Sequence, residues 1–311
     1  MTHAPDRRLD QRLDRRLDRR TFLAAAAALA LAPRKSVAVE GENATRAPAL
    51  FVYHGSPLIA VDAARAAELS AWGNALRTAN VNVKGIVAVT PHVRAADAIE
   101  IGWTGAGVAL DSYPRRFREQ LAQLDYRSPP SESLALRVES SLASAKLPFR
   151  RGDARGQNHT VWAPLLHLFP DHDAPVVELA MPFVDDAGFF ALGAALAPLR
   201  SEGVVVLASG TATHNLALLE PRALASAAPP PPPEAFAVEF DQWLRESVAH
   251  KEIDALLDWR KRAPAADLAH PDDGGHYRVL LVAAGTGFAR ASFPIEGFEM
   301  GSFSKRGIQL D

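Results

Sequence analysis

Short apolar runs alternate with longer amphipathic segments along most of this chain, and this alternation most limits the folds open to it. The short runs are rich in β-branched and small apolar residues, which is typical of buried strands. They are PALFVYH (48–54), VKGIVAVT (83–90), APVVELAM (174–181) and GVVVLASG (203–210). The pattern predicts a single α/β domain around a mainly parallel or mixed central sheet, with helices on both faces.

Helical periodicity fills the intervals between these runs. Helices are expected over 63–79, 131–145, 185–203 and 234–262. The last of these is long and carries an apolar stripe that is expected to pack in the core. Residues 289–310 predict two further strands with a glycine-rich bend. The prolines of 229–233 predict a stiff surface loop, because proline fits neither a helix interior nor an inner strand.

The first 38 residues differ from the rest of the chain. A charged repeat leads into Arg19-Arg20-Thr21-Phe22-Leu23 and an apolar run that ends at Ala32. A stable membrane span needs about 20 apolar residues, so none is expected here. The segment resembles a twin-arginine export signal, with Ser36–Ala38 as a cleavage site; a charged helical arm is the alternative. We expect a signal and arm over 1–38, contact with the export machinery, and a periplasmic or exported domain over 47–311.

Composition narrows the chemistry. The formal net charge of −2 gives no electrostatic footprint for nucleic acid. The chain has no cysteine, so disulfides, thiolate metal sites and a cysteine nucleophile are excluded. Any metal must therefore be bound by histidine, aspartate or glutamate.

Three of the expected strands lead into a histidine. His54, His92 and His214 follow the runs LFVY, IVAVTP and VVVLASGTAT. Loops at the carboxyl ends of strands in an open α/β sheet converge, so these side chains are expected to meet. His159, in GQNHTVW, and His276, at a helix start preceded by glycine, join them as candidates.

Two roles suit this group of five. Imidazole is the usual ligand for iron, zinc and copper when thiolate is absent, and it is the usual base near neutral pH. The alternative for each of the five residues, considered singly, is an ordinary loop histidine that is hydrogen-bonded and has no catalytic or metal-binding role. The remaining histidines stand in ordinary contexts; His270, for example, is expected in polar surroundings.

The segments that carry the five histidines resemble the class III extradiol ring-cleavage dioxygenase family, in its DOPA-dioxygenase-like branch. That branch has strands ending in H-G-S-P and S-A-H-W, a D-H-G-x-W segment, an A-S-G-x-x-x-H-N-L turn, an H-Y-x-x-L-L helix start and a P-I-E-G-x-E-M-G-S-x-S tail. The matching segments here are HGSP (54–57), TPHV (90–93), NHTVW (158–162), ASGTATHNL (208–216), HYRVLL (276–281) and PIEGFEMGSFS (294–304). The resemblance covers most of 48–305 in the same order.

The resemblance implies a catalytic domain that opens the ring of a catechol-type aromatic diol with O2 and one divalent metal, Fe(II) or Zn(II). His54, His92 and His276 would be the metal ligands. His214 would be the base, with a fourth ligand as its alternative role, and His159 would donate a hydrogen bond to oxygen.

Three positions depart from the family pattern. Val93 replaces a tryptophan, Gln157-Asn158 replaces Phe-Asp, and LDSYPRRF (110–117) replaces D-F-x-G-F-P. Arg115 and Arg116 in the last segment predict a substrate with a carboxylate, because an arginine fork binds that group. A zinc-dependent hydrolase and a non-catalytic exported metal-binding protein remain alternatives on the same scaffold.

Overall fold

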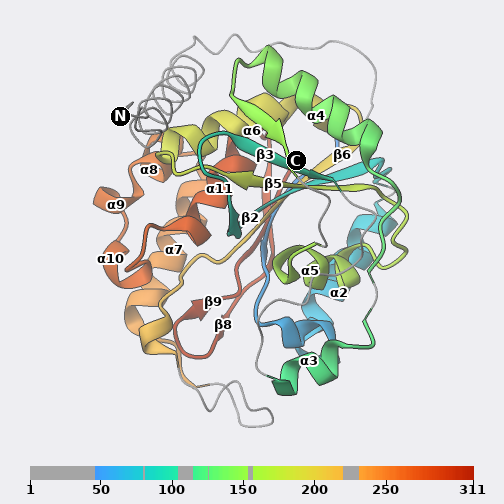
Figure 1. The fold of residues 1–311 in the computed structure, drawn as a ribbon. Helices are drawn as coiled ribbons and strands as arrows, with labels where there is room; N and C mark the ends of the chain where they lie inside the picture. Colours follow the sequence, from blue (N-terminus) through green and yellow to red (C-terminus); the bar gives the residue numbers. More distant parts are fainter. Residues whose placement is uncertain (1–45, 80, 104–114, 125, 153–156, 220–230) are drawn as a thin grey trace, which may run out of the picture.

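A computed structural model describes residues 46–311, apart from residues 80, 104–114, 125, 153–156 and 220–230 (Figure 1). The predicted export segment over 1–38 and the first two prolines of 229–233 lie outside this part of the chain. Within it, no helix is long and apolar enough to cross a membrane.

The centre of the fold is an eight-stranded mixed sheet. Its strands are β1 (Ala49–Tyr53), β2 (Gly85–Arg94), β3 (Ile99–Trp103), β4 (Phe149–Arg151), β5 (Val176–Met181), β6 (Val204–Gly210), β7 (Ala291–Ile295) and β10 (Gly307–Leu310). They lie in the order β4-β3-β5-β2-β6-β1-β10-β7. The central strands β5, β2, β6 and β1 run parallel, while β3 and β10 join this core antiparallel. A separate hairpin pairs β8 (Phe298–Glu299) with β9 (Phe303–Ser304).

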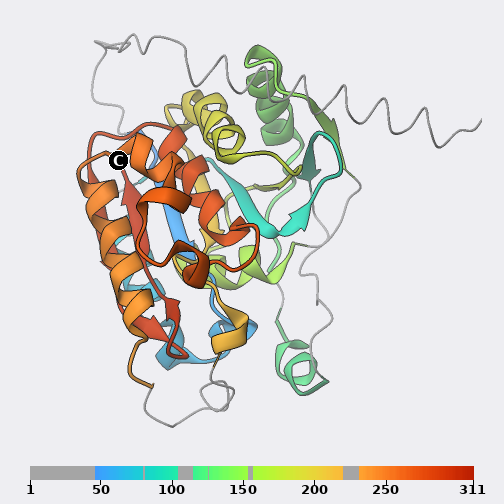
Figure 2. The same cartoon turned by 90° about the vertical axis from the view of Figure 1, so that its left-hand side faces the viewer.

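Helices cover both faces of the sheet, as the strand–helix alternation predicts (Figures 1 and 2). One face carries α4 (Glu132–Ser144), α6 (Asp186–Arg200), α7 (Ala235–Ala249) and α11 (Gly275–Gly285); the other carries α2 (Ala63–Thr78) and α5 (His159–Leu168). Alternate residues of β1 supply the two cores: Phe51 packs toward α11, and Leu50 and Val52 pack toward α2 and α5. The prediction of a single α/β domain is confirmed.

Short elements connect these layers. They are η1 (Pro57–Ala60), α3 (Arg115–Leu121), η2 (Leu216–Leu218), α8 (Ile253–Leu257), α9 (Trp259–Arg262) and α10 (Ala266–Ala269). Polar side chains cap the first turns of α2 and α5. The Asp62 carboxylate accepts from Ala64 N–H at the start of α2, and Asn158 accepts from Thr160 N–H at the start of α5.

The prediction of one long helix over 234–262 is wrong. Helix α7 ends at Ala249, and Lys251 adopts the left-handed conformation with φ of 58°. Glu252 N–H then donates to Ser247 O at 2.8 Å and Lys251 N–H donates to Val248 O at 3.1 Å, which is a Schellman ending. The chain resumes as α8 and α9.

The tail is also more divided than expected. Strands β7 and β10 join the main sheet, and the β8–β9 hairpin lies between them in sequence. The turn of this hairpin includes Met300 with φ of 55° and Gly301 with φ of 81°.

Candidate active site

Three neighbouring parallel strands, β2, β6 and β1, bring histidines to one edge of the sheet. His54 follows the last residue of β1, and His92 lies beyond the part of β2 that pairs regularly with β6. His214 is four residues past the end of β6. The three carboxyl ends therefore meet because their strands are adjacent.

Two helix N-termini complete the group from opposite faces of the sheet. His159 is the first residue of α5, and His276 is the second residue of α11. Helix α11 approaches β6 closely at Gly210, where an added Cβ would lie 2.3 Å from the His276 carbonyl oxygen. Glycine is thus required at the end of β6 if His276 is to reach the site.

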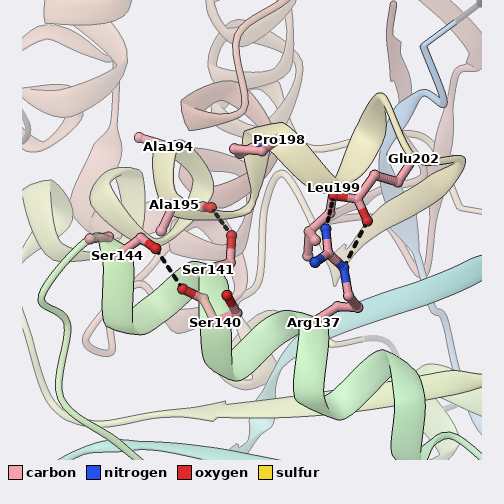
Figure 3. Close-up of a pocket in the computed structure, with 10 residues that line it drawn as sticks. Arg137, Ser140, Ser141, Ser144, Ala194, Ala195, Pro198, Leu199 and Glu202 are labelled. Carbon is pink, nitrogen blue, oxygen red and sulfur yellow. Dashed lines mark hydrogen bonds and ion pairs between the residues drawn. The ribbon is translucent and has the colours of Figure 1, made fainter.

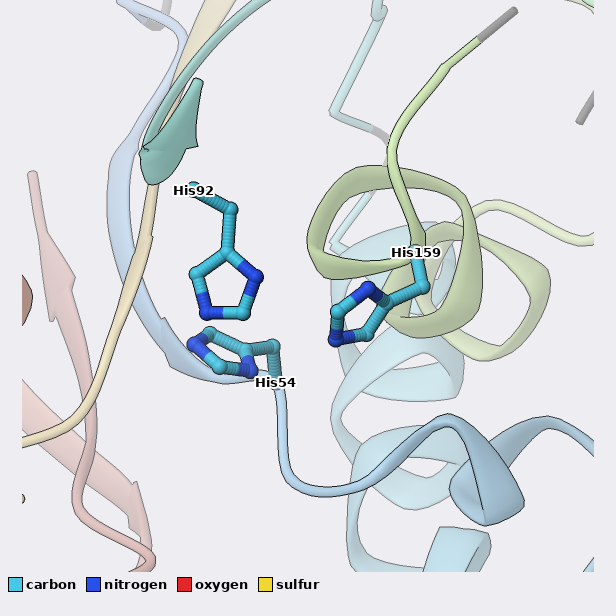
Figure 4. A group of neighbouring side chains, drawn as sticks. All are labelled: His54, His92 and His159. Carbon is cyan, nitrogen blue, oxygen red and sulfur yellow. The ribbon is translucent and has the colours of Figure 1, made fainter. Parts of the chain in front are cut away.

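The five rings form one connected group of ring contacts. His92 Nε2 and His276 Nε2 lie 3.2 Å apart, and the His54 ring centre is 5.1 Å from that of His92 and 5.4 Å from that of His276. His159 lies 4.9 Å from His92, and Figure 4 shows its ring turned toward His54 and His92. Ligand nitrogens of His54, His92 and His159 lie within 4.8 Å of one another. His159 is therefore a geometric rival to His276 as the third ligand.

His54 has the hydrogen bonding expected of a metal ligand. Its Nδ1 lies 3.1 Å from Gly55 O, so Nδ1–H donates there and Nε2 carries the lone pair. His54 Nε2 is buried and has no hydrogen-bond partner among the described residues. Two nitrogens on one tetrahedral ion with bonds of about 2.1 Å lie about 3.4 Å apart, close to the separation between His92 and His276. The residues present therefore fit a divalent metal.

Burial favours the neutral form of His54 and of His276. It holds the pKa of His54 well below the ordinary value, with repulsion from His92 and His159 adding to the effect. Burial also lowers the pKa of His276, reinforced by His214 and His54. Neutral imidazole is the form that binds a metal. His92 is exposed, so the group opens to solvent on its side.

The His214 ring stacks on His276 with centroids 3.5 Å apart and planes 11° from parallel. Rings stacked in this way direct their in-plane lone pairs along separate parallel planes, so both cannot point at one ion. Asn215 does not touch the His214 ring to orient it: its side chain accepts from Ala217 N–H and donates to Leu268 O.

Two contacts of His214 were not expected from the sequence. Its Nδ1 lies 3.8 Å from Asp272 Oδ2, and its ring meets the edge of Phe303 with centroids 5.3 Å apart. The aspartate pair before His276 was a visible signal for the first contact. Nothing in the sequence pairs Phe303 with His214.

His270 does not lie in polar surroundings, contrary to expectation. It is fully buried and meets the rings of Trp259 and Phe240 edge-on. Its Nε2 lies 2.8 Å from Ala212 O. The ring is part of the core beside the site and does not join the histidine group.

The two arginines expected to bind substrate begin α3. The side chains of Arg115 and Arg116 lie outside what the structure describes. Helix α3 packs against η1, which begins at Pro57, three residues after His54. The backbone of α3 is thus connected to the site through η1.

A groove of about 340 Å³ between α4 and α6 lies away from the histidines (Figure 3). Its polar groups are engaged within the protein: Ser141 Oγ donates to Ala195 O, and Arg137 pairs with Glu202. No histidine lines it. The histidine group is therefore the better candidate for a reactive site.

The fold and the site define an α/β protein with a histidine-rich centre suited to a divalent metal. Residues 48–300 match the family described as the catalytic LigB subunit of aromatic ring-opening dioxygenase. The chain belongs to this family, whose dioxygenases are metal-dependent.

Relatives agree with this assignment. A protein of Beta vulgaris named 4,5-DOPA dioxygenase extradiol is 30% identical over 239 residues, covering 76% of this chain and 85% of that protein. A protein of the same name from Escherichia coli K12 is 28% identical over 282 residues, covering 86% and 96%. The crystal structure of an uncharacterized protein from Escherichia coli K12 has a TM-score of 0.68 and 27% identity, and covers 86% of this chain and 100% of that chain.

Proposed function

We propose that this protein is an extradiol dioxygenase that opens the ring of a catechol-type diol with O2, using one Fe(II) or Zn(II). The observation that carries the proposal is the meeting of His54, His92 and His276 from three separate elements, with His92 Nε2 and His276 Nε2 3.2 Å apart. Both oxygen atoms enter the product when a carbon–carbon bond beside the diol is cleaved, so the reaction needs no external reductant.

His54, His92 and His276 are the proposed ligands and His214 is the proposed base, an assignment that the contacts between the rings support. A divalent metal held by His54, His92 and His276 would bind the two diol oxygens and lower the pKa of the hydroxyl groups. His214 takes the hydroxyl proton, and its stacking on His276 keeps it beside the ligands while opposing a role as a fourth ligand.

His159 and His92 complete the assignment. His159 is buried at the N-terminus of α5 and lies opposite His276 across the group, where its N–H can donate to oxygen beside the substrate. His92 is the exposed member, so substrate reaches the site on its side. In this proposal, His214 transfers the proton and His159 contacts the oxygen.

For the substrate, we propose a catechol that carries a carboxylate. The relatives named for DOPA act, by that name, on such a catechol. Arg115 and Arg116 are the proposed anchors, because an arginine fork binds a carboxylate in two places. Arg115→Ala should raise KM for DOPA and leave KM for catechol unchanged; equal effects on both would reject this anchor.

The function is tested on protein purified without oxygen and loaded separately with Fe(II) and Zn(II). We expect one metal per chain, and O2 uptake with DOPA or catechol in step with the absorbance of a ring-opened semialdehyde. His214→Gln should retain the metal and lower kcat about 10²- to 10⁴-fold. If the metal is lost in proportion to activity, His214 is a ligand and the base must be His159.

The all-histidine ligand set also suits zinc, which favours a hydrolase as the second candidate. Ester or amide turnover by the zinc-loaded protein, with no O2 uptake in either metal form, would establish it. Tight metal binding with neither activity would instead establish a metal-binding protein.

We also propose that residues 1–38 direct export to the periplasm. The supporting feature is Arg19-Arg20 before a short apolar run. Replacing both arginines by lysine should leave the protein in the cytoplasm. Unchanged export of this variant would reject the twin-arginine interpretation.

A further inference from the structure

The His214 ring is held on three sides. His276 covers one face, Phe303 approaches with its ring edge-on, and Asp272 Oδ2 lies 3.8 Å from Nδ1. The backbone is fixed as well, because His214 N–H donates to Ala269 O at 2.8 Å. The contact at Nδ1 leaves Nε2 as the ring nitrogen available for proton transfer.

Asp272 is itself firmly placed. Its Oδ1 accepts from Gly274 N–H at 2.9 Å, just before α11. Arg260 donates to Asp272 O at 2.5 Å and to His270 O at 2.8 Å, which anchors the loop. Burial would raise the pKa of Asp272, but the contacts with His214 and Gly274 N–H outweigh it and lower this pKa to about 2. The carboxylate is therefore ionised when it faces His214.

We infer that Asp272 is a positioning residue for His214. A neutral imidazole carries hydrogen on one nitrogen and a lone pair on the other. The Asp272 carboxylate favours hydrogen on Nδ1, so the lone pair stays on Nε2, where a base needs it. At 3.8 Å the carboxylate is farther than a hydrogen bond, so in this structure it acts on Nδ1 through its charge. The inference rests on the proposed role of His214 as the base.

A metal-binding role for Asp272 agrees less well with the geometry. Nitrogens of His214 and His276 and an oxygen of Asp272 lie within 4.8 Å of one another, as a ligand set would. The two rings are nearly parallel, however, so their lone pairs do not converge. Orientation of one ring by the carboxylate requires no such convergence.

The neighbouring residue supplies a matched control. Asp273 Oδ1 accepts from Gly275 N–H at 3.0 Å, just as Asp272 accepts from Gly274, but its carboxylate pairs with Arg94. Substitution by asparagine keeps the backbone contact at each position and removes the charge. Asp272→Asn and Asp273→Asn therefore differ in the loss of the carboxylate that faces His214.

We expect Asp272→Asn to lower kcat about 10- to 100-fold, the usual effect of losing a carboxylate that orients a histidine. KM and metal stoichiometry should stay at wild-type values, Asp272→Glu should recover part of kcat, and Asp273→Asn should leave kcat within about twofold. Loss of metal from Asp272→Asn would make Asp272 a ligand and overturn the inference. Wild-type kcat in Asp272→Asn would also overturn it.

A second measurement does not depend on turnover. In metal-free protein labelled with ¹⁵N-histidine, the signals that disappear in His214→Gln identify His214. We expect the Nδ1–H tautomer in the wild type and in Asp273→Asn, and a shift toward Nε2–H in Asp272→Asn. An unchanged tautomer in Asp272→Asn rejects the inference. If the tautomer shifts but His214→Gln keeps full kcat, orientation by Asp272 stands and the base assignment fails.

Discussion

The two ends of strand β1 show two different uses of buried polar groups. At the amino end, the fully buried Arg200 donates to Ala47 O at 2.7 Å, Thr286 Oγ1 at 2.8 Å and Leu310 O at 2.6 Å. At the carboxyl end, the buried His54 leaves Nε2 without a partner in the described chain. We call the amino end of β1 the closed end, because the polar group of Arg200 is hydrogen-bonded there, and the carboxyl end the open end, because His54 Nε2 is not bonded to any described residue.

The contrast distinguishes a buried polar group that stabilises the fold, Arg200, from one that is available to bind a ligand, His54. A buried polar group without a partner costs free energy, so a fold retains it where something else compensates. Arg200 ties the start of the domain to β10 and to the end of α11, and four of its five N–H groups donate within the protein. His54 has a lone pair left over in the group where the metal is proposed to bind.

The largest effect is expected from His54→Gln, which tests the open end. Loss of an orienting contact alone lowers metal affinity about 10- to 100-fold, so loss of a ligand should lower it at least about 100-fold. Ring cleavage should fall with it. Metal content by atomic emission and O2 uptake on one preparation would measure both.

The stability of this variant sharpens the contrast. Nε2 has no partner among the residues that the structure describes, so metal-free His54→Gln should unfold in urea within about 1 kcal/mol of metal-free wild type. A much larger loss of stability would mean that His54 is a structural residue like Arg200.

Arg200→Met tests the closed end. It strips donors from four buried or part-buried carbonyl and hydroxyl groups, each costing about 1–3 kcal/mol, so a loss of at least about 4 kcal/mol is expected. The kcat per folded molecule should not change. Urea unfolding and active-site titration would measure the two quantities.

The exposed pair of Arg137 with Glu202 is the control for this prediction. Arg137→Met should cost less than about 1 kcal/mol, because surface pairs contribute little. If both arginine variants lose the same stability, the clamp at Arg200 is not what closes this end of β1.

The sequence predicted the open end better than the closed one. Apolar runs with a following histidine mark strand ends, so His54, His92 and His214 were found from local pattern alone. Arg200 is part of a helix pattern, and its partners at Ala47 and Leu310 become neighbours only after β1 and β10 pair. Long-range pairing of this kind leaves no local signal.

Other features were hidden for a similar reason. The break after α7 uses Lys251 in a conformation that normally favours glycine, so residue type gave no warning. The contact of Asp272 with His214 depends on how α11 docks on the sheet, and the β8–β9 hairpin rests on two-residue strands. Periodicity needs longer segments than these.

His270 is intermediate between Arg200 and His54 in how many of its polar atoms are hydrogen-bonded. Its substitution is expected to have a smaller effect than that of either residue. Its Nε2–H donates to Ala212 O at 2.8 Å, but its Nδ1 has no partner within the described residues. Burial outweighs the hydrogen bond to Ala212 and lowers the pKa of His270 from 6.5 to about 4. The ring is half satisfied, and it stays neutral in the folded protein at a pH where an unfolded chain would protonate it.

This half-satisfied ring should make stability depend on pH. Between pH 6.5 and about 4 the unfolded state binds the proton and the folded state does not, so stability is present above this window and falls as pH decreases through it. From about pH 7.5 to about pH 5 the expected loss due to His270 is about 2 kcal/mol. His270→Gln keeps a donor for Ala212 O and cannot titrate. Urea unfolding of metal-free wild type and metal-free His270→Gln at both pH values isolates this contribution from that of the other buried histidines. An equal loss of stability in the two proteins would show that His270 does not cause the pH dependence.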